Sequence, residues 1–196
     1  MGDSGKMVTG LLGGSFNPVH IGHMMVASYI AQWGYADEVW LNLSPRNPLK
    51  SAADLASDED RLAMLRIALG GCDSLGLCDI ELSMPRPSYT IDTLDTLARK
   101  YPERHFKVII GSDNWQIFDR WRDADRIIND YGVIVYPRPG YAAPDADTPG
   151  VTVADAPMVE LSSTLLRQAI ARGRDVDYMV PTGVYNYIKE HQLYQQ

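Results

Sequence analysis

The sequence predicts an α/β fold, with an open, mostly parallel sheet and helices on both faces. Short apolar runs typical of buried strands alternate along the chain with longer segments of helical periodicity. Helices between successive strands favour parallel pairing through right-handed crossovers. The chain has 196 residues, of which 45% are hydrophobic, so we expect a single domain over residues 1–196. Its C-terminal helical part, about 162–196, should pack onto the rest.

The first predicted strand leads into the most informative segment of the chain. An apolar run from Met7 to Leu12 is followed by Gly13 and Gly14, and a helix should begin near Val19. Glycines let the backbone approach a ligand closely, and the free amides at a helix start attract anions. This strand, turn and helix predict a polyphosphate site.

The next elements continue the alternation. Val39 to Leu43 reads as a strand, and a helix should run from about Asp58 to Leu69. Ser57 can cap that helix, and Gly70-Gly71 can end it. A further strand is expected around Asp79 to Leu82.

The second half of the chain contains two clear strands, Phe106 to Ile110 and Val133 to Tyr136. A helix should begin near Thr90, before the first of them. The stretch from Gly140 to Gly150 reads as a loop, and a helix opened by Ser162-Ser163-Thr164 should close at Gly173.

Ligands of open parallel sheets bind beyond the carboxyl ends of the strands. This rule brings together the residues that follow four predicted strands: Gly14, Arg46, Asp113 and Arg138.

His20 and His23 are the first candidate catalytic residues. Their spacing places both rings on one helix face, where they can donate hydrogen bonds to phosphate oxygens. The alternative is that both are ordinary surface residues. A zinc site is disfavoured because no third His or Cys stands at a suitable spacing, so no protein metal ligand is predicted.

The segment Leu161 to Arg167 offers a second anion site. Ser162, Ser163 and Thr164 supply more hydroxyls than one helix cap needs, and Arg167 lies on the same face as Thr164. An ordinary cap followed by a solvated arginine is the alternative.

Composition limits the partners. With 18 basic and 25 acidic residues the net charge is −7, which argues against nucleic-acid and membrane surfaces. An anionic substrate must therefore be bound by a local cluster, drawn from Arg46, Lys50, Arg138 and Arg167. The N-terminus has no cleavable signal pattern, and a cytoplasmic location is expected. Oligomeric state stays open, with a homo-oligomer possible.

The segment Gly13-Gly14-Ser15-Phe16-Asn17-Pro18 followed by His20-Ile21-Gly22-His23 resembles the signature of the nucleotidyltransferases. Leu161 to Arg167 resembles their Ile-Ser-Ser-Thr-x-x-Arg element. These two elements imply a Rossmann-like nucleotidyltransferase sheet, but they do not select the acceptor. Ser88 to Leu94 and Gly111 to Asn114, followed by Trp121, are similar to segments of the nicotinate-nucleotide adenylyltransferases.

The resemblance implies roles for individual residues. Catalysis would fall to His20, His23 and Arg167. On the acceptor side, Thr90 and Trp121 would hold the pyridine ring, with Lys50 and Arg138 near the mononucleotide phosphate. The residues expected to contact ATP are Gly14, Ser15, Phe16, His20, His23, Gly111, Asp113, Ser162, Ser163 and Arg167.

The implied reaction transfers AMP from ATP to nicotinate mononucleotide, with Mg²⁺ bound mainly through the ATP phosphates. Alternative acceptors are nicotinamide mononucleotide and phosphopantetheine, and a nucleotide-binding regulator without turnover is the remaining alternative. Two positions depart from the usual pattern. Asn17 replaces the commoner Asp, and Leu49 stands where many relatives carry His.

Overall fold

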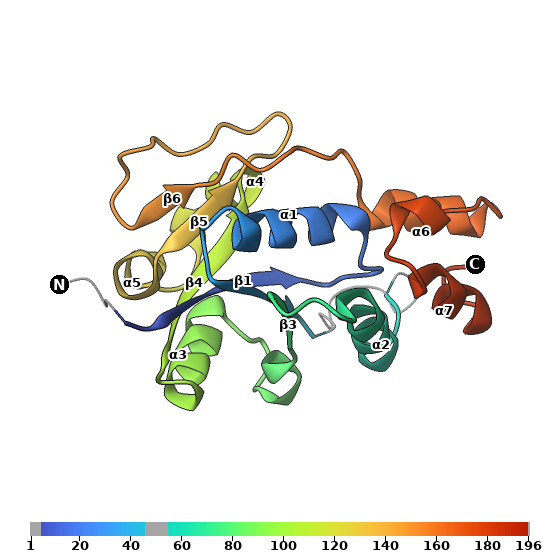
Figure 1. The fold of residues 1–196 in the computed structure, drawn as a ribbon, viewed down its shortest axis with the longest axis horizontal. Coiled ribbons are helices and arrows are strands. Elements are labelled where there is room, and N and C mark those ends of the chain that lie inside the picture. The colour runs from blue at the N-terminus through green and yellow to red at the C-terminus, as the bar shows by residue number, and fades with distance from the viewer. Residues whose placement is uncertain (1–4, 46–54, 196) are drawn as a thin grey trace.

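The computed structural model describes residues 5–45 and 55–195. Its centre is a sheet whose strands are all parallel, in the order β3-β2-β1-β4-β5-β6. The predicted α/β class is therefore confirmed (Figure 1). The strands among the described residues are β1 (Met7–Gly14), β2 (Glu38–Leu43), β3 (Leu75–Cys78), β4 (Arg104–Gly111), β5 (Val133–Tyr136) and β6 (Val151–Val153).

Helices follow most of the strands. The described helices are α1 (Ile21–Gln32), α2 (Asp58–Leu69), α3 (Thr90–Lys100), α4 (Ser112–Trp115), α5 (Ala124–Arg126), α6 (Ser163–Ala171) and α7 (Val184–Glu190), with the shorter turns η2 (Ile80–Ser83), η3 (Phe118–Arg120), η4 (Ile127–Tyr131) and η5 (Asp177–Met179). Among these helices none is long and apolar enough to cross a bilayer.

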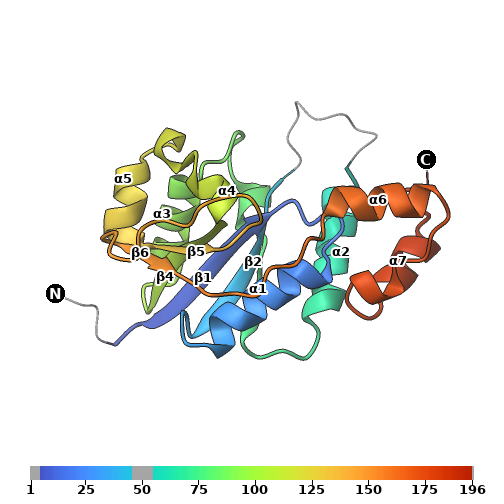
Figure 2. The same cartoon turned by 90° about the horizontal axis from the view of Figure 1, so that it is seen from above.

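The sheet separates two apolar cores because successive side chains of a strand point to opposite faces. Leu12 belongs to the core that includes residues of α1, α2, α6 and α7, whereas Leu11 belongs to the core beneath α3 and η4. Figure 1 shows α1 and α3 on opposite sides of the sheet, and Figure 2 shows α1 lying along it from above. Helices on both faces are thus confirmed.

The strand order reverses direction at β1, which pairs with β2 on one side and with β4 on the other. In a doubly wound sheet this switch point opens a crevice at the carboxyl ends of the two central strands. Here those ends are Gly14 and Gly111. The two glycine segments that the sequence analysis singled out therefore lie at the same crevice.

One predicted strand is wrong. Residues 79–82 are mostly the 3-10 turn η2, and the strand lies earlier, at Leu75–Cys78. The sequence did not indicate that strand because it contains Gly76, and glycine is unfavourable in strands. A Cβ at Gly76 would stand 2.5 Å from the Trp40 indole, so the indole occupies the space of the missing side chain. The short strand β6 follows the predicted loop and had no counterpart among the predicted elements.

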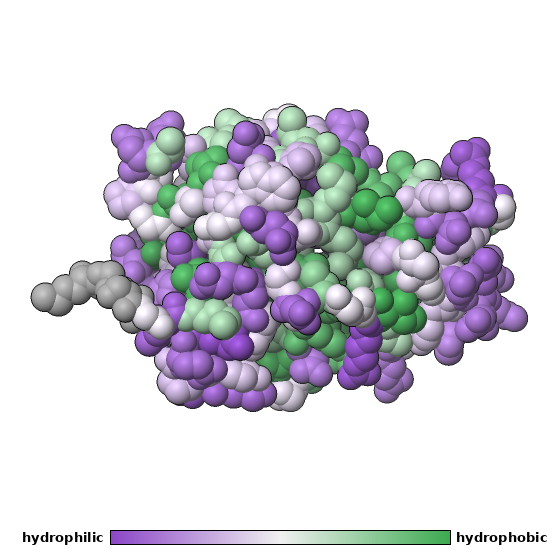
Figure 3. Space-filling view, in the orientation of Figure 1, coloured by the Kyte–Doolittle hydropathy of each residue, from purple (hydrophilic) through white to green (hydrophobic). Residues whose placement is uncertain are grey.

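The C-terminal helices contact the first half of the chain through hydrogen bonds as well as through the core. Tyr187 donates from its hydroxyl to Asp60 Oδ1 at 2.9 Å, and Tyr194 donates to Asn17 Oδ1 at 2.7 Å. Figure 3 shows hydrophilic side chains over these helices at the right, and apolar ones in the middle of the same face. The end of the chain thus bonds to the segment between β1 and α1.

Candidate active site

Two adjoining cavities lie at the switch point, beyond the ends of β1, β4 and β5. We call the one beside α1 and α6 the first cavity, about 230 Å³, and the one beside α3 the second cavity, about 210 Å³. Leu12, Asn114 and Tyr136 line both, so the cavities share a wall. Two ligands bound there would meet across that wall.

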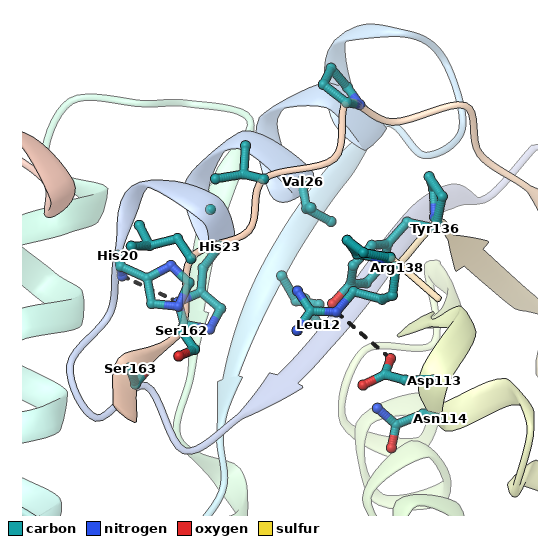
Figure 4. Close-up of a pocket in the computed structure, with 16 residues that line it drawn as sticks. Leu12, His20, His23, Val26, Asp113, Asn114, Tyr136, Arg138, Ser162 and Ser163 are labelled. Carbon is teal, nitrogen blue, oxygen red and sulfur yellow. Dashed lines mark hydrogen bonds and ion pairs between the residues drawn. The ribbon is translucent and has the colours of Figure 1, made fainter. Parts of the chain in front are cut away.

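The first cavity brings together six of the predicted site residues from distant parts of the sequence. Figure 4 shows the two imidazoles and Ser162 on one side, and Arg138 with Asp113 on the other. The six residues are His20, His23, Asp113, Arg138, Ser162 and Ser163.

The loop between β1 and α1 is held by buried side chains. Phe16 has a φ of 43°, a left-handed value that is uncommon for a residue other than glycine, and its side chain is 1% exposed. A Cβ at Gly14 would stand 3.1 Å from the Phe16 ring, so only glycine leaves that ring its place. This packing accounts for Gly14, whereas a Cβ at Gly13 would meet no described atom within 4 Å.

Arg61 of α2 supports the same loop from below. Its side chain is fully buried, and Nη1 donates to the carbonyl of Ser15 at 2.7 Å and to that of Ser44 at 2.9 Å. Nη2 pairs with Asp58 at 2.5 Å. Arg61 therefore ties the loop after β1 to the residue that follows β2.

The two histidine rings form a stack with centroids 3.6 Å apart, and the edge of Phe16 packs against His23. The backbone N–H of His20 donates to Nδ1 of His23 at 3.2 Å. Because Nδ1 accepts this bond, the proton of neutral His23 is assigned to Nε2. His23 therefore offers Nε2–H as a donor.

Burial keeps both imidazoles neutral. Desolvation, with a smaller contribution from the charge of Arg138, lowers the pKa of His20 from 6.5 to about 4. Desolvation also lowers the pKa of His23 well below its ordinary value, assisted by His20 and Arg138. At neutral pH the rings are therefore hydrogen-bond donors without charge, while Arg138 supplies the positive charge of this cavity.

This burial predicts a pH-dependent stability. The unfolded chain takes up a proton on His20 below pH 6.5, whereas the folded chain resists it until about pH 4. The free energy of unfolding should therefore fall as the pH drops through this window, by about 2 kcal/mol from this group between pH 7 and 5. Urea unfolding at both pH values should show a smaller loss for His20→Gln than for the wild type. Equal losses would contradict the buried neutral imidazole.

The start of α6 closes the first cavity. Ser162 caps the helix by accepting from the backbone N–H of Leu165 at 3.2 Å, and Ser163 donates to the carbonyl of Pro18 at 2.9 Å. Arg167 donates to the carbonyl of Asn17 at 2.9 Å and contacts Thr164 at 3.4 Å, on the predicted face. Arg167 stands beside the cavity, and it is not among the residues that line it.

The end of β4 provides the opposite wall. Arg138 Nε lies 3.9 Å from Asp113 Oδ1. This oxygen atom is buried and has no hydrogen-bond partner among the described residues. A Cβ at Gly111 would overlap both side chains, so this position needs glycine. The buried hydroxyl of Ser112 accepts from the backbone N–H of Arg138 at 2.9 Å. Ser112 therefore fixes the turn that carries Arg138.

Four more of the predicted residues line the second cavity: Gly14, Gly111, Thr90 and Trp121. Trp121 packs against Phe118 at a centroid distance of 5.2 Å and remains partly exposed. Such a position leaves an indole available for stacking on a flat ring. Asn42 and Glu81 also line this cavity, and no sequence signal had marked either of them.

Some predicted residues lie elsewhere. Ser15 is exposed, and Phe16 lies behind His23, so neither side chain lines a cavity. Lys50 and Arg46 fall outside the described residues. Arg61 was missed because a buried arginine resembles a surface one in sequence. A signal for it does exist, since it stands four residues before the buried Leu65, on the buried face of α2.

Comparisons with known proteins agree with this geometry. Residues 11–169 match the family model described as cytidylyltransferase-like. A probable nicotinate-nucleotide adenylyltransferase of Bacteroides fragilis is 47% identical over 184 residues, covering 93% of this chain and 92% of that one. One from Bacteroides thetaiotaomicron is 43% identical, covering 97% of this chain and 95% of that one.

A solved structure supports the fold. The nicotinic acid mononucleotide adenylyltransferase of Plasmodium falciparum, complexed with NaAD, aligns with a TM-score of 0.79 over 96% of this chain and 97% of that one. The identity is only 20%, so this likeness concerns the fold alone. The family match and the Bacteroides relatives show that the chain belongs to the cytidylyltransferase-like nucleotidyltransferases, within the nicotinate-nucleotide adenylyltransferase family.

Proposed function

We propose that this chain transfers the adenylyl group of ATP to nicotinate mononucleotide, forming nicotinate adenine dinucleotide and releasing pyrophosphate. The observation that carries the proposal is the pair of adjoining cavities at the switch point. One of them holds two neutral imidazoles and an arginine, and the other holds a partly exposed indole. Relatives with up to 47% identity carry the name of this activity.

In the proposed reaction, an oxygen of the acceptor phosphate attacks the α-phosphorus of ATP. A new P–O bond forms as the bond to the bridging oxygen breaks, and that oxygen leaves with its electron pair on pyrophosphate. The acceptor phosphate is already anionic, so no side chain needs to remove a proton from it. Catalysis then rests on positioning and on stabilising the charge that builds up on the phosphates.

The donor side suits this task. His23 offers its Nε2–H toward phosphate oxygens, and His20 stacks on the same ring. Hydrogen-bond donors that are already in place stabilise developing charge without having to reorganise. We assign the departing pyrophosphate to Arg167 and the start of α6, because hydrogen bonds to the Asn17 carbonyl and the Thr164 hydroxyl already hold its guanidinium beside that helix start. Gly111 and Asp113 are assigned to the ribose of ATP, and Ser162 and Ser163 to its phosphates.

Asn114 and Tyr136 stand at the wall shared by the cavities, where the two phosphates would meet. On the acceptor side, we assign the pyridine ring to Trp121 and Thr90, and the mononucleotide phosphate to Arg138. Lys50, which the resemblance places on that phosphate, lies outside the described residues. Ser15 and Phe16 would contribute through their backbone, since neither side chain lines a cavity.

Enzymes of this class generally use a divalent ion, and we propose Mg²⁺ as the companion of ATP. The residues that the structure describes include no group of three or more His, Cys, Asp or Glu placed to hold a metal. Of the described residues that line the first cavity, Asp113 is the only acidic one, and it faces Arg138. These donors do not fit a protein-held cation, so the ion would be held by the phosphate oxygens, and no step is assigned to it.

A turnover assay tests the proposal. Pyrophosphate release with ATP should be fastest with nicotinate mononucleotide and slower with nicotinamide mononucleotide or phosphopantetheine. The partly exposed Trp121 favours a flat acceptor ring over a pantetheine arm. Fastest release with another acceptor would reassign the substrate, and ATP binding without release by any acceptor would indicate a regulator.

A further inference from the structure

The second cavity has an unexpected charge. Among its described lining residues, Glu81 is the only side chain with a formal charge. The residue is 8% exposed, and none of the ion pairs among described residues includes it. The cavity wall therefore carries a negative charge that no side chain of the described chain neutralises.

Neutral donors hold this carboxylate in place. Asn42 Nδ2 donates to Oε1 at 2.5 Å and the Thr93 hydroxyl donates to the same oxygen at 3.1 Å, while the Ser88 hydroxyl donates to Oε2 at 3.1 Å. Hydrogen bonds of this kind fix the position of a carboxylate, but they leave its charge in the cavity wall. A buried charge without an opposite charge is costly in free energy, and a ligand that brings the opposite charge would offset that cost.

The other pole of the same cavity is positive. Helix α3 begins at Thr90, a lining residue, and its N-cap residue Tyr89 makes no side-chain capping bond. The first amides of the helix and its dipole favour an anion at this end. The cavity thus presents a positive helix start and a negative wall to one ligand.

We propose that Glu81 is a specificity-determining residue, whose carboxylate provides the counter-charge for a cationic pyridinium ring. This inference rests on the proposed function and names the charge pattern that its acceptor must have. Attraction between unit charges about 6 Å apart at an effective dielectric of about 20 corresponds to roughly 100-fold in affinity, so the expected preference for a charged ring is at least about tenfold.

The test compares nicotinate mononucleotide with its 1,4-dihydro form, whose ring is neutral. Dissociation constants of both are measured calorimetrically for the wild type, Glu81→Gln and Glu81→Asp. The wild type should bind the charged ring at least about tenfold more tightly. Glu81→Gln, which keeps the shape and a hydrogen-bond acceptor, should reduce this ratio to about twofold or less, while the KM for ATP stays within about twofold.

Glu81→Asp keeps the charge and should restore most of the preference. Glu190→Gln removes an exposed carboxylate from α7 and should leave the ratio unchanged. If Glu81→Gln weakens both ligands equally, the residue has only a structural role and the proposal is wrong. Equal binding of the two rings by the wild type overturns it without any variant. Failure of the wild type to release pyrophosphate with any pyridine mononucleotide would instead overturn the proposed function.

Discussion

Replacing His23 with alanine is expected to lower kcat for pyrophosphate release by about two to three orders of magnitude, the usual cost of removing a donor that stabilises transition-state charge. Among the described residues, Nε2 of His23 makes no hydrogen bond, and its Nδ1 accepts from the backbone N–H of His20. The KM for nicotinate mononucleotide should change little, because the acceptor ring is assigned to the second cavity. Initial rates at saturating ATP measure the effect.

His23→Ala should have a much smaller effect on the stability of the fold than on kcat. The His23 ring packs on Phe16 and His20, so a loss of about 1–2 kcal/mol in the free energy of unfolding is expected. His191→Ala is the matched control, since that imidazole stacks on Tyr187 at the exposed side of α7. It should leave kcat unchanged. Near-normal turnover of His23→Ala would remove the catalytic assignment.

The part of the site that could be predicted from sequence lies on elements with local signals. Gly13 and Gly14 follow an apolar strand, and the hydroxyls of Ser162 and Ser163 open a helix, so each pattern marks its own place. The rule that parallel strands collect ligands at their carboxyl ends then joins Gly14, Asp113 and Arg138, and the first cavity or its neighbour contains all three.

The residues that could not be predicted act across long sequence separations. Glu81 accepts from Asn42, which lies 39 positions away, and the strand at 75–78 depends on an indole from β2 occupying the space over Gly76. Neither the hydrogen bond nor the packing produces a periodic pattern in the sequence. A buried polar residue is recognisable only once its partners are known, because a surface residue of the same type reads identically in sequence.

Replacing Arg61 is expected to lower the free energy of unfolding more than any other single substitution proposed for this chain. Substitution with methionine keeps much of the apolar volume but leaves the carbonyls of Ser15 and Ser44 without this donor, while Asp58, which also pairs with Arg86, loses one of its partners. A buried polar group left without its hydrogen bond costs about 1–3 kcal/mol, so the two carbonyls together should cost about 3–5 kcal/mol. For a chain of this size the loss corresponds to a fall in Tm of roughly 10 °C or more, which differential scanning calorimetry measures.

The same substitution should also raise the KM for ATP, because Ser15 begins the loop that positions His20 and His23 and Arg61 is its support from α2. Arg61→Lys keeps the charge but has no forked pair of donors, so it should fall between the wild type and the methionine variant in both Tm and KM. Arg66→Met provides the control on the same helix, at an exposed position. If Arg61→Met loses no more stability than Arg66→Met, the loop after β1 does not depend on this arginine.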